Sequence, residues 1–432
     1  MTFQVEFATQ PKVLNVEFDT ALNISGGYDD GYNDGFSQGK SEGLTEGEAI
    51  GYGKGSSEAM QEFVDSRGLK YLYYNQTVSD GMLDWLTKVD LSSITSLASM
   101  FRGSNLNSLT EFPVLDARNA TNTSSMFREA SLKKALYLNT ANVKNMSYMF
   151  QQSNGLNECP AYDYSNVEDT VAMFQQTYSL KSLSPIVFPS GKTNLSCYMM
   201  FYLSRIETID ITFNSPSKAE SMFNECPNLV TADLKNTHWW TTASSMFSKC
   251  YKLKSIPSLD LINVKSISSM FSSCYVLTEI SLSNTQNVTN ISSICSTCKA
   301  LVSISTIDMR SVTSASSAFN NCYALTNLTV KNIKTNLQVG SGTSYGHLLT
   351  LESLISLCYE LRDTGSNLTL TVGSANLEKL ANVYVREIPI TDAMREADDL
   401  IDEKLPFERC ESTADGATLI TDYVLLKNWK LA

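Results

Sequence analysis

Residues 264–288 read VKSISSMFSSCYVLTEISLSNTQNV, and the features of this stretch recur along the middle of the chain. A Met-Phe pair lies inside a segment of about 24 residues. Its phenylalanine-type position is occupied by Phe101, Phe127, Phe150, Phe174, Phe201, Phe223, Phe247, Phe271, Cys295 and Phe319. Self-similarity at a fixed period of roughly 20–29 residues is typical of a solenoid, in which each coil buries its apolar face against the next. The repeat therefore predicts a solenoid of about ten coils.

Within each repeat, the segment Leu277-x-x-Ile280-x-Leu282 and its counterparts at 229–234 and 325–330 indicate a short strand with inward Ile and Leu side chains. The Ser/Asn/Thr-rich run before each Met-Phe pair reads as a return path with a helical or irregular turn. This is the leucine-rich-repeat pattern. We expect an α/β repeat solenoid, with one short parallel strand in each coil.

The phrase NVKSISSMFSSCYVLTEISL at 263–282 resembles the repeat of the BspA-like leucine-rich-repeat family, found in bacterial surface proteins and in tail or fibre proteins of phages. The resemblance covers about residues 91–330. Departures are Ile294-Cys295 and Ala318-Phe319 in place of Met-Phe, and residues 237–240, which break the Asn-Val signature. The tail looks similar to the closing cap of such proteins, with a helix at 351–362, a strand at 368–372, a helix from Ala375 and a final strand at 428–432. An acidic segment at 392–407 reads as an insertion near this cap.

A cysteine follows the phenylalanine position by three residues in five successive repeats, at Cys226, Cys250, Cys274, Cys298 and Cys322. Five cysteines in one column cannot all pair, and cytosolic synthesis favours thiols. A ladder of small buried thiols is the better interpretation. The Cys295-x-x-Cys298 pair is explained in the same way, as core, rather than as a redox or metal motif.

Glycine stands at every fourth position of an N-terminal segment: Gly27, Gly31, Gly35, Gly39, Gly43, Gly47, Gly51 and Gly55. Helix-interior glycine costs about 0.8–1.0 kcal/mol relative to alanine, so a lone helix would not form here. Associating helices could use the stripe for close backbone approach. A homo-oligomerising stalk, guessed to be trimeric, and a flexible acidic linker are both open, and the strict period favours the stalk.

The chain divides on these grounds into five regions. They are a β-hairpin anchor at 1–25, the stalk or linker at 26–56, an N-terminal cap at 57–90, the solenoid at 91–330, and a C-terminal cap with an acidic insertion at 331–432. An isolated hairpin is marginal in water, so we expect residues 1–25 to pack on a partner protein.

Composition narrows the function. The net charge is −12, and the sequence contains no cluster of Lys and Arg, which argues against nucleic acid binding. No apolar run approaches the roughly 18 residues of a membrane span, and the N-terminus shows no signal-peptide pattern. We therefore expect a protein that is made in the cytoplasm and is released or carried from there.

Apart from Cys295-x-x-Cys298, the sequence carries none of the common catalytic or metal-binding motifs. The chain contains two histidines, His238 and His347, and neither lies in a nucleophile-elbow context. H-E-x-x-H, P-loop and G-x-G-x-x-G motifs are absent from the sequence. Acidic pairs are abundant, but a solvated acidic face is their commoner explanation. We expect no catalytic residue, no metal site and no cofactor.

Binding remains. Residues between the inward ones of each strand should face outward, and those singled out as ligand-binding are small and polar, with one aromatic: Thr208, Asp210, Thr231, Asp233, Lys235, Trp239, Glu279, Ser281, Asn327 and Thr329. Such side chains suit hydrogen bonding to a glycan or a flat protein surface, and equally suit water. Trp239 takes the outward Asn position of the repeat, where it could anchor a sugar or a protein, although packing on an adjacent coil is as plausible.

These observations lead to a hypothesis of a non-enzymatic phage virion appendage (tail, fibre or head fibre), which binds a host-surface glycan or protein or serves as a structural spacer. Its partners would be copies of itself through residues 26–56 and virion structural proteins through residues 1–25. The alternatives are a bacterial surface adhesin of the same repeat family and, with less support, a polysaccharide-degrading tail enzyme.

Overall fold

The structure is a computed structural model, and every residue that it describes lies in one compact unit, Ser57–Ala432. The described residues are 61, 65, 69–70, 72–83, 86, 89–109, 112, 115, 118–339, 349–362, 368–372, 374–381, 383–387, 407–410, 418–421, 424 and 429–431. The predicted hairpin at 1–25, the glycine stripe at 26–56 and all but one residue of the predicted acidic insertion at 392–407 lie outside them.

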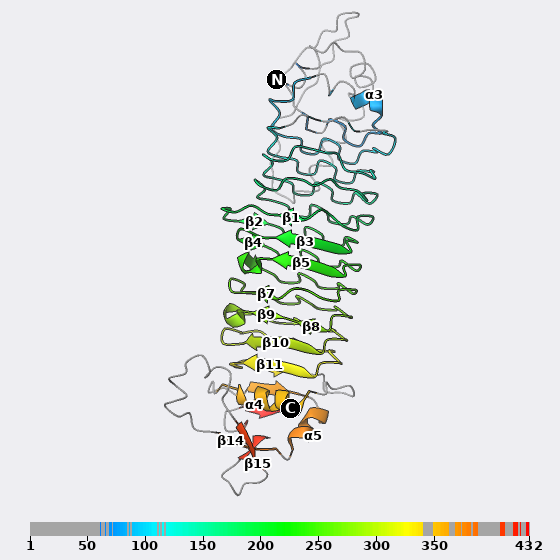
Figure 1. Ribbon diagram of the computed structural model, residues 1–432. Helices are drawn as coiled ribbons and strands as arrows, with labels where there is room; N and C mark the ends of the chain where they lie inside the picture. The colour runs from blue at the N-terminus through cyan, green and yellow to red at the C-terminus, as the bar shows by residue number, and fades with distance from the viewer. Residues whose placement is uncertain are drawn as a thin grey trace, which may run out of the picture. The chain divides into compact units, whose positions relative to one another are not determined.

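The middle of the chain is a stack of coils joined by parallel pairing (Figure 1). Its strands and 3-10 turns are β1 (Ile186–Val187), β2 (Leu195–Ser196), β3 (Thr208–Thr212), β4 (Ser217–Lys218), β5 (Thr231–Lys235), η2 (Thr237–Trp239), β6 (Trp240–Thr242), β7 (Leu259–Asp260), β8 (Glu279–Ile280), β9 (Leu282–Ser283), η3 (Thr285–Asn287), β10 (Ser303–Asp308), β11 (Asn327–Lys331) and β12 (Leu337–Gln338). The repeat solenoid is confirmed, as a parallel β-solenoid. The count of ten coils and the helical stalk stay predictions.

The prediction of one strand per coil is wrong. The sheet β1-β3-β5 forms one face, and a second ladder, β2-β4-β6, runs beside it, so coils in this part carry two short parallel strands. Single bridges continue this second ladder on both sides, for example Asn122↔Asn145 and Asn290↔Ser314. The return path contains turns and these bridges, with no α-helix in residues 118–339. Asn and Ser side chains concealed this strand, because their composition reads as a loop.

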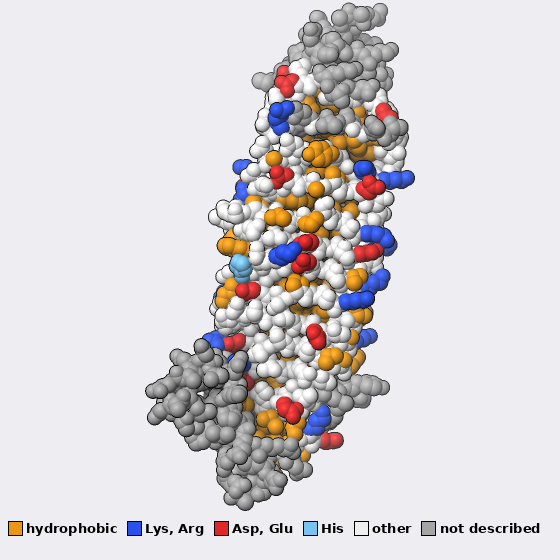
Figure 2. All heavy atoms as spheres, in the orientation of Figure 1, with side chains coloured by type: hydrophobic (Ala, Val, Ile, Leu, Met, Phe, Trp, Pro, Cys, Tyr) orange, Lys and Arg blue, Asp and Glu red, His pale blue; other side chains and the backbone are white. Residues whose placement is uncertain are grey.

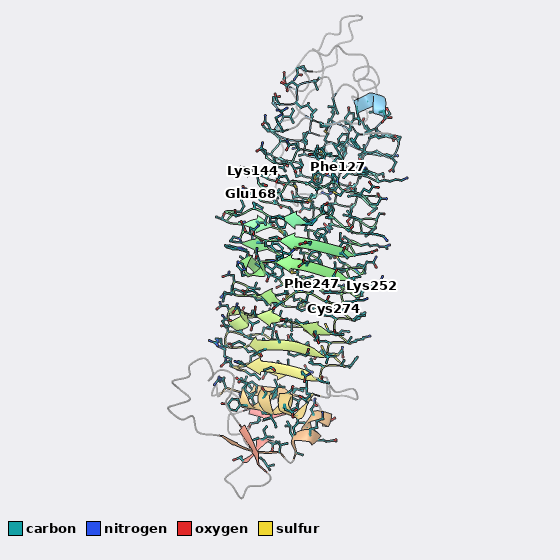
Figure 3. The ribbon with its side chains drawn as sticks, in the orientation of Figure 1. Phe127, Lys144, Glu168, Phe247, Lys252 and Cys274 are labelled. Carbon is teal, nitrogen blue, oxygen red and sulfur yellow. The ribbon has the colours of Figure 1, made fainter. Side chains whose placement is uncertain are left out.

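A column of stacked rings runs through the solenoid, and Figure 3 labels two of its members, Phe127 and Phe247. Successive centroids lie 5.2–5.7 Å apart and the rings are within 9° of parallel. The column contains Tyr73, Phe101, Phe127, Phe150, Phe174, Phe201, Phe223, Phe247 and Phe271, all fully buried. Tyr73 thus extends the ring column into the predicted N-terminal cap, and Cys295 interrupts it before Phe319.

Left-handed backbone flanks each ring. The residues two before and two after the phenylalanine position have positive φ in every repeat, as at Ser245 (56°) and Lys249 (61°) around Phe247. A run of turns closes the coil here and directs the ring inward. Only one of these positions, Gly103, is a glycine, so the fold accepts the cost of left-handed L-residues to keep the ring in place.

Ser269 tests this geometry, since its φ is 54°. Replacing Ser269 with valine is expected to lower the free energy of unfolding by about 1–3 kcal/mol, because a β-branched side chain is strained at positive φ. Ser269→Gly, the matched control, should stay within about 1 kcal/mol of the native chain. Urea denaturation measures both, and equal stability of the two variants would contradict the assigned backbone.

The five ladder cysteines are buried free thiols. Each is hydrogen-bonded to a main-chain carbonyl of the preceding coil: Cys226 to Phe201, Cys250 to Phe223, Cys274 to Phe247, Cys298 to Phe271 and Cys322 to Cys295, with S···O distances of 2.9–3.2 Å. In the N-terminal repeats the hydroxyls of Ser104 and Ser153 donate in the same way to the main-chain carbonyls of Tyr73 and Phe127. The thiol is therefore a structural donor that takes the place of a serine hydroxyl.

Cys250 offers a paired test of this role. Cys250→Ala leaves the buried Phe223 carbonyl without its side-chain donor and opens a small void, so we expect a loss of about 1–3 kcal/mol in the free energy of unfolding. Cys250→Ser keeps a donor and should cost less than about 1 kcal/mol. Urea unfolding under reducing conditions distinguishes them, and a serine variant weaker than the alanine variant would refute the donor role.

The ends of the described region use other elements: α3 (Asp80–Leu83) near the N-terminal coils, and α4 (Leu351–Tyr359), β13 (Leu368–Thr371), α5 (Ser374–Leu380), β14 (Tyr384–Glu387), β15 (Phe407–Cys410), β16 (Thr418–Leu419) and β17 (Trp429–Leu431) after β12. The α4 helix begins after Thr350, whose hydroxyl accepts from the Ser353 N–H at 3.2 Å. Parallel pairing continues in the order β12-β13-β17, whereas β15-β14-β16 is antiparallel.

Candidate binding surface

Three of the predicted ligand-binding residues meet on the sheet β1-β3-β5. Asp210 and Asp233 are direct partners in the β3–β5 ladder. The Lys235 ammonium lies 2.8 Å from Asp210 Oδ1 and 3.1 Å from Asp233 Oδ2. Hydrogen bonds to Asp210 and then Asp233 raise the pKa of Lys235. Lys235 thus stabilises two like charges that would otherwise repel each other across the ladder.

The other predicted strand residues lie in columns along the same side of each coil. Thr208 pairs with Thr231, which bridges to Ser255, and Glu279 pairs with Ser303, which pairs with Asn327. Thr208, Thr231, Glu279, Ser281, Asn327 and Thr329 are all exposed. The Ser281 hydroxyl lies 3.0 Å from that of Ser258, and the side chains of the others make no hydrogen bond or ion pair with the described part of the chain. We name this surface, from Thr208 to Thr329, the sheet face.

Trp239 is separate from these residues. It is the last residue of η2, in the turn after β5, and it is half-buried. Its ring centroid lies 5.2 Å from that of His238. The neighbouring Trp240 is fully buried and packs against Phe213. In five other coils this position carries an asparagine that donates to a carbonyl of the preceding coil at 2.7–2.9 Å: Asn119, Asn142, Asn166, Asn263 and Asn287. The Asn-Val signature is therefore a structural clamp, and Trp239 replaces one clamp.

Polar side chains also tie coils together at the corner after the sheet face. Asn236 donates to Asn214, Asn284 to Asp260 and Asn332 to Asp308, with N···O distances of 3.0–3.2 Å. Since these groups satisfy one another, this column is a coil-to-coil ladder rather than an open site.

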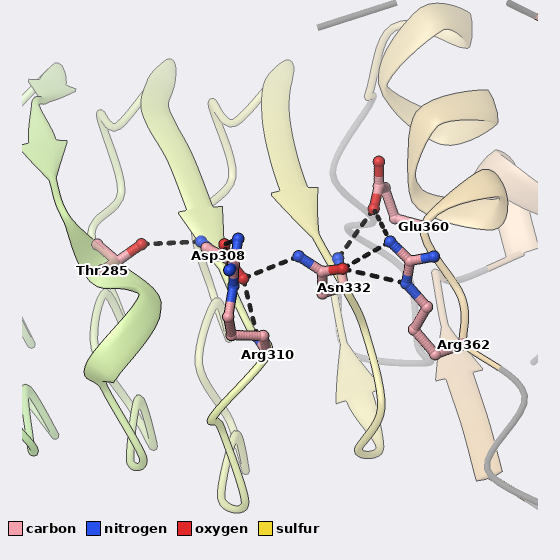
Figure 4. A network of polar contacts seen from close by, with 6 residues as sticks. All are labelled: Thr285, Asp308, Arg310, Asn332, Glu360 and Arg362. Atoms are coloured by element: carbon pink, nitrogen blue, oxygen red, sulfur yellow. Dashed lines mark hydrogen bonds and ion pairs between the residues drawn. The ribbon is translucent and has the colours of Figure 1, made fainter. Parts of the chain in front are cut away.

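The ladder ends in the network of Figure 4, which joins the solenoid to the segment after α4. Asp308 accepts from Asn332 at 3.0 Å and from Arg310 at 2.6 Å, and Arg362 donates to Asn332 at 2.6 Å. Burial opposes the charged form of Asp308, but the Arg310 hydrogen bonds outweigh it and lower the pKa of Asp308. The network is structural.

One exposed feature was missed from the sequence. The position four residues after the ring position is aromatic or basic in six coils, with Pro227 between the second and the third: Tyr178, Arg205, Tyr251, Tyr275, Lys299 and Tyr323. Tyr251 and Tyr275 stack at 4.9 Å, Lys299 Nζ lies 5.0 Å from the Tyr275 ring centroid, and Arg205 lies 5.5 Å from that of Tyr178. The 24-residue phase could have revealed this column, but sequence alone did not show which way the turn after the cysteine faces.

Burial lowers the reactivity of the thiols in the described residues. Burial raises the pKa of the Cys226 and Cys197 thiols to about 12, and raises that of Cys295 as well, so these thiols are poor nucleophiles. His238 lies beside Trp239, and His347 is outside the described residues. Within the described ranges, His, Cys, Asp and Glu do not gather in threes as a metal site requires, and helices long and apolar enough to cross a membrane do not occur.

Comparison with known proteins gives a family and a distant structural likeness. The crystal structure of a leucine-rich repeat protein from Bacteroides ovatus ATCC 8483 is similar at 13% sequence identity and a TM-score of 0.28, over 56% of this chain and 72% of that one. A likeness this weak does not bear on the fold, which rests on the pairing described above. Curated proteins give no match.

The family model described as "Mycoplasma protein of unknown function, DUF285" matches residues 69–185 and 217–335. These two segments cover more than half of the 432 residues and most of the coils that carry the ring column. The chain therefore belongs to the DUF285 family.

Proposed function

We propose that this chain is a non-catalytic display protein, whose solenoid presents outward side chains to a glycan or protein on a host cell surface. One observation carries the proposal. The inward residues largely repeat from coil to coil, as in the ring column and the five ladder cysteines. The outward residues of the sheet face instead change along the stack, from Thr208 and Thr231 to Glu279 and Asn327. A surface whose side chains vary along the stack, on a core that largely repeats, suits recognition better than a purely structural spacer.

The setting that we propose is a phage virion appendage. The BspA-like resemblance of the repeat supports it, together with the glycine stripe at 26–56 as an assembly element and residues 1–25 as an anchor on virion proteins. The alternative setting is the bacterial cell surface, as an adhesin. Mass spectrometry of purified phage particles and of host cell fractions separates the two: the proposal expects the protein in particles, and recovery only from cells would favour the adhesin.

The assembly part of the proposal has its own measurement. By light scattering, the full-length chain should be an oligomer, and a chain beginning at Ser57 should be a monomer. A monomeric full-length chain would contradict assembly through the glycine stripe in the absence of other virion proteins.

A polysaccharide-degrading enzyme is less well supported. The adjacent carboxylates of Asp210 and Asp233 are the natural candidates for a glycosidase pair on the sheet face. Both are bonded to the Lys235 ammonium, and Asp233 is exposed. A glycosidase instead needs one carboxyl held as an acid beside the scissile bond.

Binding through the sheet face can be tested by obstruction. Thr231→Arg with Ser281→Arg places two large side chains on exposed positions of that face. Retention of the protein on host cells should fall at least tenfold if the ligand lies there. Ser316→Arg, also at an exposed position but before the Met-Phe position, is the control and should leave retention unchanged.

A further inference from the structure

A second exposed surface lies where the chain turns back after each buried cysteine. We name it the tyrosine–lysine ridge, and it consists of Tyr251, Lys252, Lys254, Tyr275, Lys299 and Tyr323. The three tyrosines are 38%, 37% and 48% exposed, which is unusual for aromatic residues at a repeating position. Figure 2 shows basic side chains gathered along one long edge of the solenoid, and Figure 3 places Lys252 on that edge.

The cations of this ridge are available. Lys252 Nζ is bonded to the amide oxygen of Asn228 at 3.0 Å, and Lys299 lies over the Tyr275 ring. Among the described residues, the ion pairs do not include Lys252, Lys254 or Lys299. The nearby Lys249 is already paired with Glu225 at 2.7 Å. In a chain of net charge −12, three cations without acidic partners on one edge form a local site for anions.

The arrangement of the tyrosine rings limits the class of ligand that the ridge can bind. Tyr251 and Tyr275 cover one another's faces at 4.9 Å, and Lys299 lies over the Tyr275 ring. Tyr251 and Lys299 together occupy the faces of the Tyr275 ring, so this ring does not offer a platform for a nucleic acid base, which binds by lying on a ring face. The exposed parts of such a stack are ring edges and hydroxyls, which donate and accept hydrogen bonds as sugar hydroxyls and carboxylates require.

The spacing of the ridge suits a linear polymer. Each coil contributes one step along the axis, at the roughly 4.8 Å separation of paired strands. Tyr251, Lys252 and Lys254 lie on the coil of Phe247, and Tyr275, Lys299 and Tyr323 follow on the next three coils. Cations and tyrosine hydroxyls that follow one another along the stacked coils are complementary to a chain that carries negative charge and many hydroxyls.

We propose that the tyrosine–lysine ridge binds an anionic linear polysaccharide laid along the solenoid axis. Its carboxylates lie at the ammonium groups of Lys252, Lys254 and Lys299, and its hydroxyls bond to the tyrosine hydroxyls. The proposal rests on the display function proposed above and gives it a ligand class and a surface distinct from the sheet face.

The test compares two triple variants of the full-length chain with equal change of charge. Lys252→Gln/Lys254→Gln/Lys299→Gln alters the ridge. Lys218→Gln/Lys265→Gln/Lys334→Gln alters exposed lysines on β4, before Ser266 and after β11, and is the control. Binding of size-defined polygalacturonate at about 0.15 M salt, with neutral dextran as the blank, should weaken at least tenfold in the ridge variant and less than twofold in the control. Near-native unfolding curves establish that both variants are folded.

A second variant examines the rings. Tyr251→Phe/Tyr275→Phe keeps the stack and removes two hydroxyls, and affinity for polygalacturonate should fall about threefold to tenfold. Full retention of affinity in this variant would overturn the hydroxyl contacts.

The remaining outcomes separate the ridge from the display function. Equal losses in the two lysine variants, or none in either, would overturn the ridge as the site. Tighter binding of polyglutamate or oligo-dT at equal charge would replace the polysaccharide with an acidic peptide or a nucleic acid, and so refute the proposed ligand. Binding of neutral bacterial glycans without polygalacturonate would refute the ridge and leave the display function standing, whereas binding of none of a broad panel would overturn both.

Discussion

Replacing Phe247 with alanine is expected to lower the free energy of unfolding by about 3–5 kcal/mol. The ring is fully buried and stacked between Phe223 at 5.5 Å and Phe271 at 5.7 Å, so its removal leaves a void that touches two further coils. Urea denaturation followed by circular dichroism measures the loss. Because coils of a solenoid are stabilised by their neighbours, the unfolding transition should also broaden or split at this coil.

Phe247→Leu is the matched control. Leucine keeps much of the apolar volume but loses the ring stacking, so we expect a smaller cost of about 1–2 kcal/mol. If the alanine variant lost less than about 1 kcal/mol, the ring column would not be the core of the solenoid.

Replacing Trp429 in the last strand, β17, with alanine is expected to lower the free energy of unfolding by a comparable amount, about 3–5 kcal/mol. Trp429 is buried, pairs with Leu368 in the ladder from β13 to β17, and donates from Nε1 to the Arg362 carbonyl at 2.9 Å. Its loss would uncover the C-terminal end of the parallel stack, and terminal caps keep repeat arrays soluble. The variant should therefore unfold at lower urea concentration and aggregate more readily, as light scattering would detect.

Trp429→Phe separates packing from the hydrogen bond. It keeps an aromatic ring on β17 but cannot donate to Arg362, so a cost of about 1–2 kcal/mol is expected. Native stability in the alanine variant would mean that β17 does not close the array.

The inward half of the fold was predictable from the sequence. Met-Phe and cysteine positions repeat in a fixed phase, and periodicity of apolar residues is the strongest local signal that a chain carries. The structure places Phe101 to Phe271 and the five ladder cysteines in buried columns at those positions. The final strand, expected at 428–432 from the resemblance of the tail to a closing cap, is present as β17.

The outward half was less predictable. The second strand ladder was missed because Asn122, Asn145 and Asn290 pair through their main chain, which polar composition does not reveal. The Asn-Val signature was read as outward-facing, although its amides clamp adjacent coils. Hydrogen bonds of this kind depend on which coil lies beside which, and a single repeat does not contain that information.

The candidate binding surface was also only partly predictable from the sequence. Alternation within a strand placed Asp210, Asp233 and Lys235 outward, as the structure has them, but their shared ion pair requires knowing the β3–β5 register. The tyrosine–lysine ridge depends on the direction of a turn, which left-handed residues such as Lys249 set. A sequence predicts left-handed backbone readily only at positions occupied by glycine or asparagine.

The most direct test of the display function is to incubate the full-length chain with a panel of bacterial surface polysaccharides and record both retained protein and released reducing ends. We predict saturable retention on at least one anionic polysaccharide, with no release of reducing ends above the background. Release of reducing ends would show an enzyme and contradict the account, as would the absence of retention on every member of the panel.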